Sequence, residues 1–125
     1  MFEHVGESYW PTYMKDILSF LKPGGKAMIQ TITITEERFE EYRDGSDFLR
    51  EHIFPGGMLP SRQRFEGLAE DVGLRVNNVF EFGVDYAITL ERWLSNLDVN
   101  LDTVKELGYS DKFIRKWRFY LEKGQ

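Results

Sequence analysis

The 125-residue sequence contains no cysteine, which excludes disulfide bonds, thiolate nucleophiles and cysteine-based zinc sites. It has no apolar run near the roughly 18 residues that a membrane span requires. Its first residues also lack the basic-then-apolar pattern of a secretory signal. We therefore expect a soluble, cytoplasmic protein, a location that fits the absence of cysteine.

An excess of positive charge is also missing, since the formal net charge is -5. Nucleic-acid-binding proteins usually carry a basic footprint, so we expect no nucleic-acid partner. The tightest basic cluster is Lys112, Arg115, Lys116 and Arg118, whose spacing suits the solvated face of a helix. Charge alone does not exclude a membrane-surface protein, because a local basic patch can suffice.

Several catalytic signatures are absent as well. The sequence has no GxGxxG, no P-loop and no GxSxG elbow, and neither glycine pair has the strand–loop–helix setting of a phosphate-binding turn. The two histidines, His4 and His52, lie far apart without ligand spacing, so we expect no metal site. The composition is nevertheless that of a folded domain, with 42% hydrophobic and 15% aromatic residues in a length that suits one domain.

Apolar periodicity and capping residues predict helices along most of the chain. Ser61 and Ser110 are expected to cap two of them, and Gly45 is expected to break the charged stretch 35–52 into one or two short helices. The other predicted helices have apolar residues in phase on one face. The helix predictions cover about 9–22, 62–72, 85–97, 100–107 and 111–123.

Two segments, 26–34 and 74–83, are predicted to be strands. The first reads KAMIQTITI, a nearly continuous β-favouring run that is typical of a strand buried on both faces of a parallel sheet. Its alternation would place Met28, Gln30 and Ile32 on one side. A buried amide needs partners, so Gln30 either faces a polar pocket or bonds to local backbone.

The order of helix, Pro-Gly-Gly turn and strand indicates an α/β fold of the Rossmann-like kind. Two strands against five or six helices are too few for a doubly wound sheet. We therefore expect either that the chain belongs to a larger domain or that another chain completes the sheet. Open sheet edges favour pairing, so a homodimer is one such arrangement.

Four segments together resemble the cyclopropane fatty acid synthases, in that family's order and spacing. They are FEHVG with the following YWPTYM, LKPGGKAMIQTIT, IFPGGMLPS and DYAITLERW, which begin at residues 2, 21, 53 and 85. The resemblance implies that residues 1–125 form the C-terminal part of a class I S-adenosylmethionine-dependent methyltransferase domain. It also implies that the cofactor-binding half is missing, so we expect this chain alone to be inactive.

The family transfers a methylene or methyl group to unsaturated acyl chains of phospholipids, which implies a partner at the membrane surface. The alkene attacks the sulfonium methyl group, and a bound bicarbonate takes the proton whose loss closes the ring. Such a site must be dry, and aromatic faces can stabilise the cation.

Motif matching carries the family's functional residues onto this sequence. Glu3, Tyr86 and the backbone of Ile32 match groups that hold the bicarbonate, while Gln30 replaces the family's histidine. Glutamine donates a hydrogen bond but carries no charge, so a different base is an alternative. The remaining matches are Met1, Phe2 and His4 for the cofactor pocket, and Phe54 and Leu90 for the acyl tunnel.

Other interpretations stay open from the residues alone. Tyr86 is in phase with Leu90 and Trp93, so it fits core packing as well as chemistry. Glu3 without the family match is a solvated carboxylate. The whole chain also fits a non-catalytic lipid-binding or dimerising remnant of the fold, or a small-molecule methyltransferase that shares only the fold.

Overall fold

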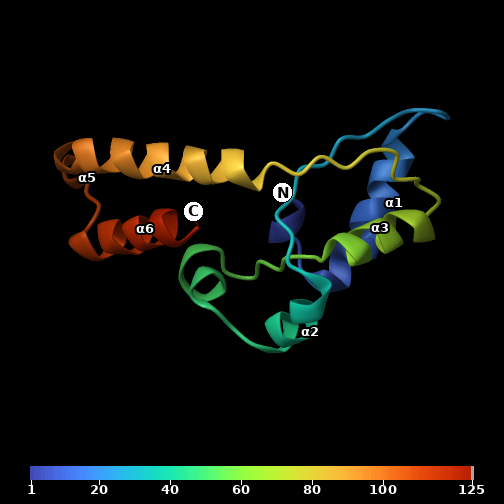
Figure 1. Ribbon diagram of the computed structural model, residues 1–125, viewed down its shortest axis with the longest axis horizontal. Coiled ribbons are helices and arrows are strands. Elements are labelled where there is room, and N and C mark those ends of the chain that lie inside the picture. The colour runs from blue at the N-terminus through green and yellow to red at the C-terminus, as the bar shows by residue number, and fades with distance from the viewer. Residues whose placement is uncertain (125) are drawn as a thin grey trace. The chain divides into compact units, whose positions relative to one another are not determined.

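The computed structural model describes residues 1–124, and the chain divides into two compact units, residues 1–79 and the part from residue 80 onward. Figure 1 shows helices joined by extended segments. The first unit contains α1 (Trp10–Phe20), α2 (Glu36–Asp44) and α3 (Arg62–Asp71), with 3-10 turns at Phe2–His4 and Glu7–Tyr9 and a π-helical turn at Leu49–Ile53. The second unit contains α4 (Gly83–Val99), α5 (Leu101–Glu106) and α6 (Asp111–Lys123).

The helix predictions are confirmed, and so are the two serine caps. The Ser61 hydroxyl accepts from the Arg64 backbone N–H at 3.2 Å, and the Ser110 hydroxyl accepts from the Phe113 N–H at 3.1 Å. These bonds satisfy amides that have no partner inside the first turn of a helix. Gly45 follows α2 directly, which confirms the predicted break in the charged stretch.

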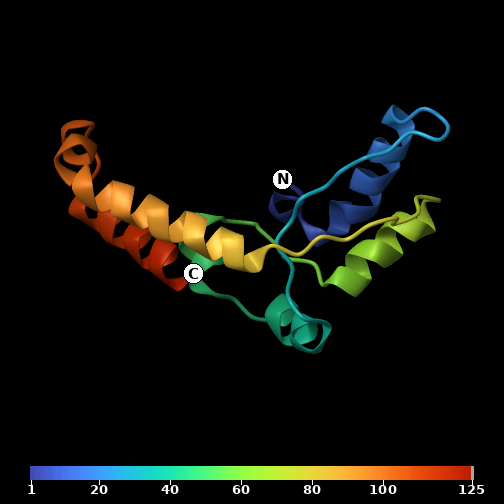
Figure 2. The same cartoon turned by 45° about the horizontal axis from the view of Figure 1, so that its top comes forward.

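The strand predictions are wrong for the residues that the structure describes, where all regular structure is helical. Residues 26–34 and 74–82 run as extended chain in Figures 1 and 2, without a ladder. Ile34 does bond through its N–H to the Pro60 carbonyl at 2.9 Å. Met28, however, is 98% exposed and Gln30 is exposed too, so this segment is not buried on both faces. β-Favouring residues set an extended backbone, but a strand also needs a neighbour to pair with.

The core of the first unit surrounds Phe2, whose side chain is fully buried. Its ring lies 5.2 Å from Trp10, 5.0 Å from Tyr13 and 5.1 Å from Phe65, measured between centroids. Because α1 supplies two of these rings and α3 the third, Phe2 fixes the N-terminal turn on the paired helices α1 and α3. Replacing so buried a ring by alanine typically costs about 3–5 kcal/mol.

The second unit is a helical hairpin closed by a short third helix. α4 and α6 pack side by side, as Figures 1 and 2 both show, and α5 turns the chain between them. Its buried residues come from the facing sides of the two long helices: Leu90, Ile114, Tyr120 and Leu121. Arg118 of α6 adds a two-pronged ion pair to Asp98 of α4, with N–O distances of 2.7 and 3.2 Å.

Candidate functional site

The N-terminal turn and the Phe-Pro-Gly-Gly loop meet at Glu3. The Met58 backbone N–H donates to the Glu3 carbonyl at 2.8 Å, and the rings of His4 and Phe54 contact each other at 5.3 Å between centroids. Phe2 anchors the turn from the core side. Residues predicted for the cofactor pocket and for the acyl tunnel, His4 and Phe54, are therefore neighbours in this unit.

Two glycines allow this close approach. Gly56 has a φ of +78°, the left-handed region that side chains avoid. Gly57 is buried, and a Cβ built on it would lie 3.1 Å from the Phe54 carbonyl oxygen and 3.3 Å from that of Glu3. A side chain at Gly57 would press on the Glu3 carbonyl and one at Gly56 would strain the backbone, which is a physical reason for the Gly-Gly pair.

The Glu3 carboxylate is partly buried and holds a hydrogen bond from the predicted strand segment. Thr31 Oγ1 donates to Glu3 Oε2 at 3.2 Å, and the N-terminal ammonium lies 3.3 Å from the same oxygen. Burial alone would raise the pKa of this carboxyl. The backbone N–H of Glu3, the ammonium and the Thr31 hydroxyl together outweigh burial and lower the pKa below its ordinary value of 4.5.

Thr31 also connects Glu3 to Ile32. Its hydroxyl lies 3.2 Å from the Ile32 carbonyl oxygen as well as 3.2 Å from the Glu3 carboxylate. The backbone group predicted at Ile32 is thus linked through one hydroxyl to the predicted carboxylate. Gln30 is exposed and adjoins Thr31 in sequence, so the structure places it beside this site without joining it to Glu3.

Tyr13 is a second neighbour of Glu3 that sequence reasoning missed. Burial raises the pKa of the Tyr13 phenol, and the negative charge of Glu3 raises it further. The phenol therefore stays protonated and remains available as a hydrogen-bond donor near the carboxylate. Thr31 was missed because 28 residues separate it from Glu3, and Tyr13 because its helical phase marked it only as a core residue.

The remaining predicted residues differ in exposure. Met1 is 75% exposed, whereas Phe2 offers a ligand only its backbone because its ring lies in the core. Tyr86 is half-buried on α4, one turn before the fully buried Leu90. Leu90 packs against the end of α6, where a Cβ on Gly124 would come within 3.0 Å of its Cδ1. Tyr86 and Leu90 belong to the second unit, and their part in the site stays a prediction.

Residues 1–124 contain neither a cluster of metal ligands nor a membrane-spanning helix. No group of three or more histidine, aspartate or glutamate side chains in this range is placed to hold a metal ion. None of the helices in the same range combines the length and the apolar character needed to cross a bilayer.

Comparison with known proteins places this geometry in a family. The family described as "Mycolic acid cyclopropane synthetase" matches residues 1–125. Tuberculostearic acid methyltransferase UfaA1 of Mycobacterium tuberculosis is 34% identical over 122 residues, covering 97% of this chain and 29% of that protein. Cyclopropane-fatty-acyl-phospholipid synthase of Escherichia coli K12 is 29% identical, covering 97% of this chain and 30% of that protein.

A solved structure agrees with the sequence relatives. Mycolic acid cyclopropane synthase CmaA1, complexed with SAH and CTAB, superposes with a TM-score of 0.83 at 27% identity, covering 96% of this chain and 45% of the solved one. The chain thus spans less than a third of the length of the two curated relatives above. Because the family match extends over its whole length, the chain belongs to the mycolic acid cyclopropane synthetase family.

Proposed function

We propose that residues 1–125 form the C-terminal part of a class I S-adenosylmethionine-dependent methyltransferase domain. The substrate would be the unsaturated acyl chains of phospholipids, which receive a methyl or methylene group. The observation that carries the proposal is the convergence of three family-like segments on Glu3, through the bonds from Met58 and Thr31 and the His4–Phe54 contact. Family membership supports the same chemistry.

The exposed side chains of the N-terminal turn fit one edge of a cofactor site. S-adenosylmethionine, when bound, supplies the electrophilic methyl group. Met1 and His4 are exposed and would contact it, while Phe2 would hold the turn in place from the core. The contact between His4 and Phe54 supports an apolar, aromatic border between cofactor and acyl chain. Such a border excludes water and offers ring faces to a developing cation.

The acid–base part of the proposal centres on Glu3. Its lowered pKa keeps the carboxylate charged at neutral pH, so it is a hydrogen-bond acceptor. The Ile32 carbonyl is a second acceptor in the same unit, and the Gln30 amide is a donor. Bicarbonate carries both an O–H donor and acceptor oxygens, so this set of residues fits it; when bound, it would supply a base.

The test is methyl transfer by the longest open reading frame that contains these residues, expressed in a bacterium without its own cyclopropane synthase. Mass spectrometry of the phospholipids should show unsaturated chains heavier by one methylene, carrying label from isotopic methionine. Glu3→Gln should lower this product by at least about 100-fold, because the variant loses the charged acceptor that would hold the base, and general-base catalysis contributes that much. Glu37→Gln, a change in the first turn of α2, is the matched control and should leave the yield unchanged.

Two results would contradict the proposal. One is folded, well-expressed protein without any mass gain in the acyl chains. The other is an equal loss of product in the Glu3 and Glu37 variants, because that would assign Glu3 no special part. Retention of the double bond or its disappearance in the product then distinguishes methylation from ring closure.

A further inference from the structure

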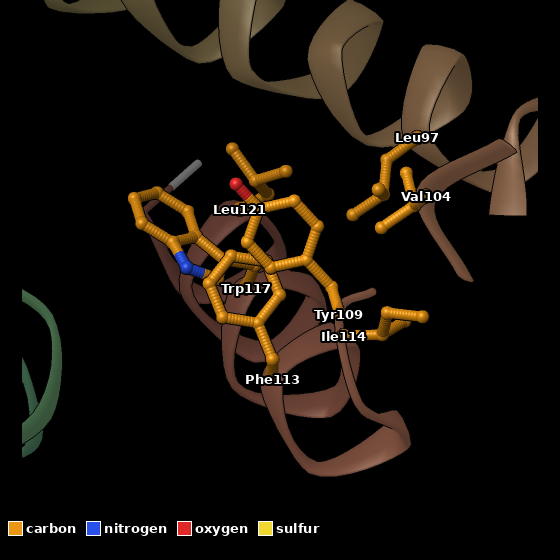
Figure 3. A pocket seen from close by; sticks show the side chains of 7 residues that line it. All are labelled: Leu97, Val104, Tyr109, Phe113, Ile114, Trp117 and Leu121. Carbon is orange, nitrogen blue, oxygen red and sulfur yellow. The ribbon is translucent and has the colours of Figure 1, made fainter. Parts of the chain in front are cut away.

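Helix α6 has an aromatic side that packs within the second unit. The Tyr109 and Phe113 rings stack at 4.4 Å, and Trp117 follows at 6.1 Å from Phe113, measured between centroids. Figure 3 shows these rings beside the aliphatic Leu97 and Val104, around an apolar hollow of about 310 Å³. Phe113 and Trp117 on this side are half-buried within the unit, while Tyr109 is 48% exposed.

A neighbouring side of α6 carries only lysines and one ring. Lys112, Lys116, Phe119 and Lys123 are spaced i, i+4, i+7 and i+11, which puts them on one face at 3.6 residues per turn. We call this face the lysine flank. Phe119 is 43% exposed, and the Lys123 ammonium lies 5.9 Å from the centre of its ring.

No ion pair among the described residues neutralises the charge of the flank, since none of its three ammonium groups forms one within residues 1–124. Elsewhere in the unit, Arg118 pairs with Asp98, and Lys105 pairs with Asp111. The whole of α6 has five basic and two acidic residues, a net charge of +3, in a chain whose net charge is -5.

We propose that the lysine flank docks the protein on an anionic phospholipid surface. Lysines beside an exposed aromatic ring suit the boundary between headgroups and acyl chains, where both the charge and the ring are stabilised. The overall charge of -5 opposes any polyanion, so the exposed Phe119 ring is what favours a lipid surface over a nucleic acid. The inference rests on the proposed function, since it names the surface from which the acyl substrate would be taken.

The experiment is vesicle co-sedimentation of the 125-residue chain, with vesicles of phosphatidylcholine alone or mixed with phosphatidylglycerol. We expect binding to the anionic vesicles only, weakening as salt rises. Changing the three flank lysines to glutamine should weaken it on the order of 100-fold, because each lysine contributes about 5-fold near such a surface. The control changes Lys15, Lys22 and Lys26, three exposed lysines of the first unit, to glutamine and should bind within about 2-fold of the parent chain.

A second variant changes the three flank lysines to arginine, which keeps the charge, and should still bind anionic vesicles. Circular dichroism of both flank variants checks that their helix content is unchanged, so that a loss of binding is not a loss of folding. Equal loss in the two glutamine triples, equal binding to neutral vesicles, or no vesicle binding would each overturn the proposal. So would flank-dependent binding of duplex DNA without binding of vesicles. The vesicle assay does not depend on methyl transfer, so the two proposals can fail separately. If the chain binds vesicles but the protein transfers no methyl group, the proposed function is refuted and the docking surface is retained.

Discussion

Thr31 is the residue through which the extended segment acts on the candidate carboxylate. Its hydroxyl donates to Glu3, so Thr31→Val should raise the pKa of Glu3. An NMR titration of the Glu3 carboxyl carbon, on protein with an acetylated N-terminus to remove the ammonium, measures the shift. Thr33→Val, two residues along the same face, is the control and should leave that titration where it was.

The lowered pKa of Glu3 predicts how the stability of the first unit depends on pH. The pKa of Glu3 is lower in the folded state than in the unfolded state, so its carboxylate stabilises the fold above pH 4.5. That stabilisation is lost as the pH falls through the lowered folded pKa. The difference in unfolding free energy between the parent and Glu3→Gln should therefore shrink below pH 4.5. A difference that is constant through the acid range would contradict the lowered pKa of Glu3.

The serine that caps α3 makes one more hydrogen bond than the serine that caps α6, among the bonds found in residues 1–124. Ser61 is fully buried, accepts from the Arg64 N–H, and also donates to the Glu36 carboxylate at the start of α2. Ser110 is exposed and accepts only from the Phe113 N–H among the bonds found in residues 1–124. We expect Ser61→Ala to cost about 2 kcal/mol and Ser110→Ala about 1 kcal/mol.

Native-state hydrogen exchange measures the two costs separately, because α3 and α6 lie in different compact units whose amides can be followed one by one. The amides of α3 should lose more protection in Ser61→Ala than those of α6 lose in Ser110→Ala. Equal losses would mean that the hydroxyl bond to Glu36 adds nothing to the cap.

The sequence allowed the helices to be predicted because their signals are local. Serine caps, apolar phase and terminating glycines act within a few residues, as at Ser61 and Gly45. The prediction of a strand at residues 26–34 was wrong because the pairing partner that a strand needs is not encoded in the segment itself. Only those residues of the candidate site that lie within a recognisable motif could be predicted. The resemblance named Glu3 and Phe54, whereas the partners Thr31 and Tyr13 depend on packing between distant segments, which no short pattern records.

At the scale of the whole molecule, the exposed extended segment predicts self-association of this chain. Met28 is 98% exposed in a β-favouring stretch, and residues 26–33 have no ladder partner within the described part of the chain. An unpaired segment of this kind is a template for another chain, and an inserted lysine opposes such pairing. We expect sedimentation velocity to show dimers or larger species that grow with concentration and that Met28→Lys reduces at least several-fold. Leu107→Lys is the matched control, because Leu107 is 71% exposed and follows a helix, α5, and not an extended segment. If both variants reduce self-association equally, general hydrophobicity drives it. A monomer at every concentration would show that the extended segment does not pair with another chain.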